Sequence, residues 1–168
     1  MTTVKLINIM RQTVLFSLIL FVICNAGIAG EKASKKECIE KCKIAAKLIQ
    51  DIGIDKAFIK LMDIKGEFVW KDTYIFTIDF NGIMIAHPIK PKMNGRDISG
   101  LKDINGKMFI ADLVDIAKNK GEGWVDYMWS KLNESTPSLK QTFVYRVNGT
   151  KIFVAAGIYP DENLNDSP

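Results

Sequence analysis

The chain has 168 residues, of which 48% are hydrophobic and 25% are charged, and its formal net charge is +4 at pH 7. Lys5 and Arg11 are the only charged residues before residue 30, so removing residues 1–29 leaves 21 basic against 19 acidic residues. A chain this close to neutral lacks the basic surface that nucleic-acid binding requires, and we expect no nucleic-acid partner.

An uncharged run over residues 13–30 follows these two basic residues. A basic start, a short apolar stretch and then small residues such as Gly27 and Ala29 are typical of a secretory signal peptide. We therefore expect residues 1–29 to be cleaved and the protein to be periplasmic or secreted. The run is near the lower length limit for a membrane span, roughly 17–25 residues, so an uncleaved N-terminal anchor is the alternative.

Residues 32–61 favour a helix, since they are rich in Ala, Lys, Ile, Leu and Glu and contain no proline. Ser34 is the expected N-cap, and Gly53 is expected to end or bend the helix before a second short one. We assign residues 30–66 to an N-terminal helical region. Its long helix is a candidate surface for a homodimer.

Cys38 and Cys42 lie one helical turn apart on the same face of this helix. Export permits a disulfide, although four residues apart on a helix is near the outer limit of the geometry. Three interpretations stay open at this point: a strained disulfide within the chain, a bridge between chains, and two buried thiols.

Two Asn-Gly dipeptides, at 81–82 and 148–149, each lie between alternating apolar runs. Asn-Gly suits the two positive φ angles of a type I′ turn, which joins antiparallel strands. We therefore predict one hairpin from residues 74–80 and 83–87, and a second from residues 142–147 and 150–158. Two such hairpins favour an antiparallel sheet.

Between the hairpins we expect a long loop over residues 88–106, an amphipathic helix over 108–118 that ends at Gly121, and a strand over 124–129. Helices segregated to one side of an antiparallel sheet define an α+β fold. We assign residues 67–160 to this sheet domain and residues 161–168 to a flexible tail.

Several segments in succession resemble the single Cache domain family of bacterial extracytoplasmic sensors. They are Phe68-Val69-Trp70-Lys71-Asp72-Thr73-Tyr74-Ile75-Phe76, Ala86-His87-Pro88, Gly95-Arg96-Asp97, Asp103-Ile104-Asn105-Gly106-Lys107, Gly123-Trp124-Val125-Asp126-Tyr127-Met128-Trp129, Lys140, Tyr145 and Gly157-Ile158-Tyr159. The resemblance covers about residues 35–160. It implies a PAS-like antiparallel sheet of about five strands behind a long N-terminal helix, and a small-molecule ligand held between the sheet and the loops over it.

The residues expected in a ligand site are mostly aromatic, with one histidine and one lysine. Each aromatic has core packing as its alternative, and simple alternation puts Tyr127 and Trp129 on one face and Trp124 on the other. We expect a short carboxylate on Lys140, whereas an amine would favour Asp126. The candidate ligand-binding residues are Trp70, Tyr74, His87, Trp124, Tyr127, Trp129, Lys140 and Tyr145.

His87 is the only histidine, so a site of several histidines around a metal is excluded, and we expect no metal and no cofactor. The order of residues matches no nucleophilic triad or Gly-rich phosphate loop, and we expect no enzymatic activity. The predicted function is extracytoplasmic sensing of a short organic acid or similar metabolite, with a membrane receptor or kinase as a candidate partner. The alternative is an interaction or dimerisation module without its own ligand.

Overall fold

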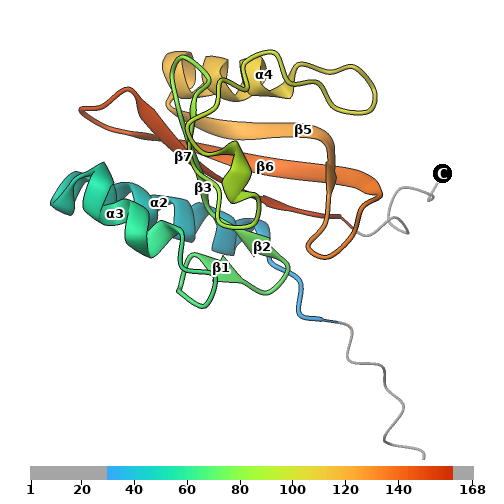
Figure 1. The fold of residues 1–168 in the computed structure, drawn as a ribbon, viewed down its shortest axis with the longest axis horizontal. Coiled ribbons are helices and arrows are strands. Elements are labelled where there is room, and N and C mark those ends of the chain that lie inside the picture. The colour runs from blue at the N-terminus through green and yellow to red at the C-terminus, as the bar shows by residue number, and fades with distance from the viewer. Residues whose placement is uncertain (1–29, 161–168) are drawn as a thin grey trace, which may run out of the picture. The chain divides into compact units, whose positions relative to one another are not determined.

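A computed structural model describes residues 30–160, so the predictions of a signal peptide and of a C-terminal tail lie outside the described residues. Helices and strands combine into the predicted α+β fold (Figure 1). In chain order the elements are α2 (Lys35–Ile52), α3 (Ile54–Leu61), β1 (Val69–Trp70), β2 (Thr73–Tyr74), β3 (Phe76–Asp79), β4 (Met84–Ala86), the 3-10 helix η2 (Pro91–Met93), α4 (Phe109–Asp115), the π-helix η3 (Ile116–Lys120), β5 (Glu122–Ser130), β6 (Pro137–Val147) and β7 (Ile152–Ile158).

The N-terminal helix begins and ends where the sequence predicts. The Ser34 hydroxyl accepts a hydrogen bond from the Glu37 N–H at 3.2 Å, and the Glu37 carboxylate accepts one from the Ser34 N–H at 2.8 Å. This reciprocal capping box satisfies donors that the first helical turn leaves unpaired. Gly53, with φ at 78°, separates α2 from α3, because a positive φ cannot continue a right-handed helix.

The antiparallel sheet has five strands in the order β4-β3-β7-β6-β5. Strands β3 and β4 form the first predicted hairpin, and β6 and β7 form the second. The pairing of β3 with β7 joins the two hairpins, with Phe76 opposite Ala155. The run predicted as one strand over residues 74–80 is divided, because β2 pairs with β1 in a separate two-stranded sheet.

Both hairpin turns differ from the predicted type I′ geometry. Only the glycines have a positive φ, 85° at Gly82 and 78° at Gly149, whereas the preceding asparagines do not. Asp79 explains the first turn, since its Oδ1 accepts hydrogen bonds from the N–H groups of Asn81 and Ile83. In the second turn the Thr150 hydroxyl donates to the Val147 carbonyl at 2.8 Å.

The two faces of the sheet have separate hydrophobic clusters, with α2 and α3 on one side and α4 on the other (Figure 1). Alternation along the strands divides the side chains between these clusters. Phe143 and Ile75 pack on the side covered by α2 and α3, whereas Phe76 and Ile78 pack on the side covered by α4. We call these two sides the α2 face and the loop face.

The connection between β4 and β5 covers the loop face. Its helix begins at Phe109, one residue later than predicted, and continues as the π-helix η3 to Gly121, which has φ at 84°. Residues 88–107 contain the short helix η2 and an isolated bridge from Asp97 to Ile83, and they form the long loop predicted over residues 88–106. Within residues 30–160 no helix combines the length and hydrophobicity needed to cross a membrane.

Candidate ligand-binding cavity

A small cavity lies on the loop face, between the sheet and the segments that cover it. Aromatic and aliphatic side chains line it: Tyr74, Phe76, Met84, His87, Met93, Ile98, Leu101, Phe109, Ile110, Tyr127 and Trp129. The centre of a water molecule can occupy only about 10 Å³ of it, which is room for roughly one water. A larger ligand therefore requires the covering loop, which supplies Met93, Ile98 and Leu101, to shift outward.

Lys140 is the buried cationic side chain of this region, with 0% of its surface exposed. It lies on β6 directly opposite Tyr127 of β5, and its Nζ is 3.4 Å from the Tyr74 hydroxyl. The same nitrogen lies over the rings of Tyr74, Tyr159 and Phe76, at 4.4, 5.3 and 5.6 Å from their centroids. Within residues 30–160 it has no ion pair. Burial lowers the pKa of Lys140 to about 7, because removal from water disfavours the charged amine.

Gly157 on β7 provides the space for this lysine. A Cβ built on Gly157 would lie 2.5 Å from the Lys140 Cε and 2.5 Å from the Thr142 Oγ1. Strands β6 and β7 pair here, with Thr142 opposite Gly157. Any side chain at position 157 would therefore force Lys140 out of its present position.

His87 lies at the end of β4 and contributes a ring to the same cavity. Its Nδ1 accepts a hydrogen bond from the Lys90 N–H at 3.0 Å, so the neutral ring carries its proton on Nε2. Burial lowers the pKa of His87 to about 3, with the positive charges of Lys140 and Lys90 adding to the effect. The imidazole is thus a neutral hydrogen-bond donor at physiological pH.

Tyr127 and Trp129 share the loop face, as alternation predicts. The Tyr127 ring stacks on Phe109 at 4.1 Å, and its hydroxyl accepts a hydrogen bond from the Thr142 hydroxyl at 3.1 Å. Trp129 lies edge-on to Phe109 at 5.6 Å. The Nζ of Lys90 lies 4.2 Å above the Trp129 ring, which brings a second cation to the cavity.

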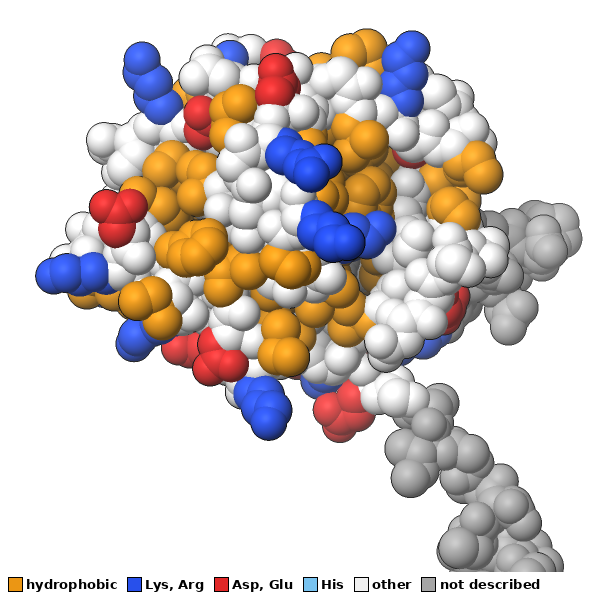
Figure 2. Space-filling view, viewed as in Figure 1, with side chains coloured by type: hydrophobic (Ala, Val, Ile, Leu, Met, Phe, Trp, Pro, Cys, Tyr) orange, Lys and Arg blue, Asp and Glu red, His pale blue; other side chains and the backbone are white. Residues whose placement is uncertain are grey.

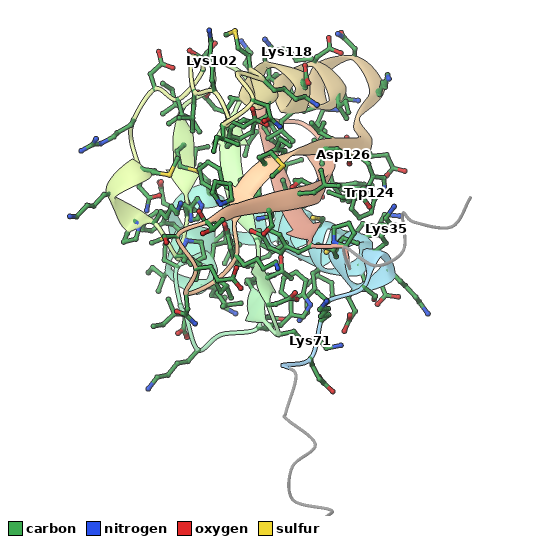
Figure 3. The ribbon with its side chains drawn as sticks, turned by 90° about the vertical axis from the view of Figure 1, so that its right-hand side faces the viewer. Lys35, Lys71, Lys102, Lys118, Trp124 and Asp126 are labelled. Atoms are coloured by element: carbon green, nitrogen blue, oxygen red, sulfur yellow. The ribbon has the colours of Figure 1, made fainter. Side chains whose placement is uncertain are left out.

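Three of the predicted site residues lie on the α2 face instead. Trp124 packs on Phe143, and the Nζ of Lys35 lies 5.2 Å from its ring, as their neighbouring positions in Figure 3 indicate. Tyr145 and Trp70 pack against the same hydrophobic cluster, away from the cavity. The structure thus brings Tyr74, His87, Tyr127 and Trp129 together around the cavity, places Lys140 beside Tyr74, and leaves Trp70, Trp124 and Tyr145 outside.

Cys38 and Cys42 are free, fully buried thiols in this structure, which favours the interpretation as two buried thiols. Cys42 points toward the Phe143 carbonyl across the core, with its Sγ 3.9 Å from that oxygen. Burial raises the pKa of Cys38 to about 12 and raises the pKa of Cys42 strongly. Both side chains act as packing groups, because a buried neutral thiol is a poor nucleophile.

The predicted amine anchor, Asp126, lies on the exposed side of β5. Its Oδ2 accepts a hydrogen bond from the Gln141 Nε2 at 3.2 Å, and it lines a different, open groove beside Trp124. Asp103 stabilises a turn at residues 103–106, since its Oδ1 accepts hydrogen bonds from the N–H groups of Asn105 and Lys107. No group of three or more His, Cys, Asp or Glu side chains suited to a metal occurs among the described residues.

Sequence reasoning overlooked Lys90, Gly157 and Tyr159 as parts of this region. Gly157 and Tyr159 belong to the Gly157-Ile158-Tyr159 segment that carries the family resemblance, which was the available signal for them. Lys90 gives no comparable signal, because a lysine between Ile89 and Pro91 in a loop is normally solvated.

Curated relatives match this chain over about half its length. Methyl-accepting chemotaxis protein McpP of Pseudomonas putida is 29% identical over 91 residues, which are 54% of this chain and 17% of that protein. Sensor histidine kinase MctS of Rhizobium johnstonii is 33% identical over 92 residues, which are 55% of this chain and 20% of that protein. The chain thus matches only a fifth or less of the length of these two relatives.

Solved structures match the fold over most of the described residues. A periplasmic sensor domain of a chemotaxis protein has a TM-score of 0.61 at 26% identity, covering 73% of this chain and 88% of that one. A methyl-accepting chemotaxis protein from Vibrio parahaemolyticus has a TM-score of 0.64 at 26% identity, covering 76% and 88%. A Cache chemosensory domain described for carboxylic acid recognition has a TM-score of 0.66 at 24% identity, covering 75% and 92%, a likeness that shows the fold alone.

The family assignment rests on the match of a family model. The model of a family described as the Cache domain matches residues 45–163, well over half of the chain. This range contains the whole antiparallel sheet and every residue that lines the cavity. The chain therefore belongs to the Cache domain family.

Proposed function

We propose that this Cache domain binds a short organic carboxylate in the cavity on its loop face, with Lys140 as the anionic ligand's partner. The observation that carries the proposal is a fully buried lysine that has no ion pair within residues 30–160. Lysine is almost never fully buried without a partner, since an unpaired buried charge is costly. A ligand carboxylate would supply the missing partner.

Neighbouring donors fit the second oxygen of a carboxylate. The Tyr74 hydroxyl lies 3.4 Å from the Lys140 Nζ, and the neutral His87 ring, which carries its proton on Nε2, lines the same cavity. Lys90 at the Trp129 ring adds a second positive charge. Two lysines contact residues of the cavity lining, and the lining itself has neutral donors and no acidic residue, which favours an anion over an amine.

The size and apolar lining of the cavity favour a short ligand chain. Phe109, Tyr127 and Trp129 form a continuous aromatic wall with ring separations of 4.1 to 6.3 Å. Such a wall excludes water, and exclusion of water strengthens the attraction between a carboxylate and Lys140. We expect a ligand of about two to four carbons. The cavity has room for roughly one water, so each additional carbon requires the covering loop to shift further.

A matched set of three-carbon compounds tests this proposal by thermal unfolding. Propionate should raise the melting temperature by several degrees at a concentration of about 100 times its dissociation constant, which corresponds to about 2.7 kcal/mol. Propionamide and propylamine, of similar size, should not. Lys140→Met keeps an unbranched side chain, one atom shorter and without the charge, and should abolish the shift. Equal shifts with propylamine would contradict a carboxylate site.

The family supports a sensory role for the binding event. Chemoreceptors and histidine kinases are the relatives that contain matching segments, and one matching solved domain is described as periplasmic. We propose that ligand binding occurs outside the cytoplasm and is passed to a receptor or kinase. The sensory role is the role that the names of these relatives give to them, and we propose the same role for this protein.

Exposed isoleucines support the interaction module as a second candidate function. On α2, Ile44 is 48% exposed and Ile52 is 38% exposed, and Ile59 on α3 is 73% exposed. Hydrophobic side chains also lie at the surface among charged ones in the space-filling view (Figure 2). If this surface forms a homodimer, Ile44→Lys with Ile52→Lys should make the molecular mass by light scattering independent of concentration. If the unaltered protein has the mass of a monomer at all concentrations, the proposed homodimer is contradicted.

A further inference from the structure

We propose that the amine of Lys140 captures a small 2-oxo acid covalently, as an imine between its Nζ and the ligand's carbonyl carbon. This inference rests on the proposed function, because it places the ligand in the same cavity and requires the same carboxylate. It goes beyond that function in assigning Lys140 a second mode of binding, one that selects a carbonyl group beside the carboxylate.

The surroundings of the Lys140 nitrogen suit a nucleophilic amine. Three rings and one hydroxyl surround it, and no carboxylate forms an ion pair with it within the described part of the chain, although the more distant charge of Asp72 favours the ammonium form. A desolvated lysine in a hydrophobic pocket is one of the ways in which proteins activate this amine for attack on carbonyls. Consistent with that environment, burial lowers the pKa of Lys140 to about 7, so a large fraction of the amine is neutral near neutral pH.

Tyr74 can move the protons that imine formation requires. The neutral amine attacks the carbonyl carbon, a C–N bond forms, and the carbonyl oxygen takes a proton from the Tyr74 hydroxyl, which lies 3.4 Å from Nζ. The nitrogen returns a proton to the Tyr74 oxygen, which gives a carbinolamine. The C–O bond then breaks, the oxygen leaves as water with a second proton from Tyr74, and loss of the remaining nitrogen proton to Tyr74 leaves the neutral imine.

This sequence releases one water and requires no oxidant, reductant or metal. Hydrolysis by one water reverses it, as sensing requires. The carboxylate of the ligand needs a different cation once Lys140 is bonded to carbon. Lys90, whose Nζ lies over the Trp129 ring of the cavity wall, is that cation, and the His87 Nε2–H is an additional donor. Two lysine nitrogens, one beside Tyr74 and one over Trp129 of the cavity lining, thus favour a ligand with adjacent carbonyl and carboxylate groups.

Reductive trapping followed by peptide mass mapping tests the inference. The protein is incubated at pH 7 with pyruvate and cyanoborohydride, which converts an imine into a stable secondary amine. We expect one adduct at Lys140, formed at least about tenfold faster than at an average surface lysine, because an exposed amine with a pKa near 10.4 is almost entirely protonated at this pH. Lys140→Met should remove that adduct, and Tyr74→Phe, which keeps the ring, should slow it.

Outcomes that overturn the imine are distinct from those that overturn the carboxylate site. Adducts spread evenly over surface lysines, or unchanged in Lys140→Met, would overturn the imine. If propionate still stabilises the unaltered protein but not Lys140→Met, the proposed carboxylate site stands even though no imine forms. An adduct at Lys140 that propionate does not slow would instead support the imine while contradicting a shared carboxylate site.

Discussion

Lys140 sets the pH dependence expected of the folded protein. Its pKa is about 7 in the fold and about 10.4 when unfolded, so between these values the unfolded chain binds more protons. The free energy of unfolding therefore rises with pH across this range, by up to about 1.4 kcal/mol per pH unit. The loss of stability that the buried amine causes reaches its full value below pH 7. Removing the buried amine removes that penalty.

Comparison of the unaltered protein with Lys140→Met isolates this effect. Other buried groups also make the stability depend on pH. Above about pH 8.5 the raised pKa values of Cys38 and Cys42 make the free energy of unfolding fall as the pH rises, which opposes the effect of Lys140. Below about pH 6.5 the lowered pKa of His87 makes the free energy of unfolding fall as the pH falls. We predict that Lys140→Met is more stable by a few kcal/mol at pH 6, and that the difference narrows to near zero at pH 10. Urea denaturation at both pH values measures it; a pH-independent difference would contradict a neutral buried amine.

Gly157 is predicted to be intolerant of even one methyl group. A Cβ there would also lie 2.9 Å from the Gln141 carbonyl oxygen, so neither Lys140 nor the strand can move aside easily. Gly157→Ala should cost about 1–3 kcal/mol by overpacking and should abolish carboxylate binding by displacing Lys140. Gly100→Ala is the control, since no atom lies within 4 Å of its added Cβ. Equal stabilities of the two variants in chemical denaturation would show that the strand accommodates the methyl group.

At the scale of elements, a four-residue segment connects the cavity with the start of α2. Tyr74 touches Lys140, and the Thr73 hydroxyl donates to the Gly157 carbonyl at 2.6 Å. Asp72 accepts a hydrogen bond from the Ala33 N–H at 2.7 Å, and the Lys71 Nζ lies 2.7 Å from the Glu37 carboxylate. Figure 3 labels Lys71 at the end of the molecule where the chain enters α2. The hydrogen bond with Lys71 is the main cause that lowers the pKa of Glu37 to about 2.

Asp72 is the member of this segment whose removal gives the clearest prediction. Asp72→Ala leaves the partly buried backbone N–H of Ala33 without its acceptor, which should cost about 1–2 kcal/mol. Amide hydrogen exchange should quicken at residues 33–38. Asp51→Ala is the matched control, because Asp51 pairs with Lys47 on the exposed surface of α2, where such pairs contribute little. Unchanged exchange at residues 33–38 in Asp72→Ala would contradict the role of this contact.

Local patterns predicted the elements well and their connections less well. The Asn-Gly dipeptides marked both hairpins, yet Asp79 and Thr150 side chains determined the turns, so the type I′ prediction was wrong. Alternation placed Tyr127 with Trp129 and apart from Trp124. Which of these faces α2 covers depends on the pairing of β3 with β7, which joins residues about 75 positions apart and leaves no local signal.

The depth of the candidate site could not be predicted from the sequence either. Lys140 was selected through the family resemblance, but its complete burial depends on Gly157 in the neighbouring strand and on Tyr159 beyond it. For Trp70 and Tyr145 the sequence allowed both a cavity and a core position, and the structure places both beside the α2 cluster. Aromatic content alone does not distinguish these positions, since both faces of the sheet are hydrophobic.

At the scale of the whole molecule, the protein is a Cache domain whose two sheet faces differ in role. The α2 face is a packed core with two inert thiols, whereas the loop face combines a buried amine, neutral donors and a small cavity covered by a loop. The central claim is that a carboxylate binds Lys140 in its protonated form. The affinity should therefore be constant below about pH 7 and weaken by up to about tenfold per pH unit above it, until the pKa of the bound lysine is reached.

Isothermal titration of propionate at pH 6 and pH 9, into the unaltered protein and into Lys140→Met, tests this claim most directly. We predict saturable binding by the unaltered protein at pH 6, binding about 100-fold weaker at pH 9, and no binding by Lys140→Met at either pH. Equal affinity in Lys140→Met, or an affinity that does not change between the two pH values, would contradict it.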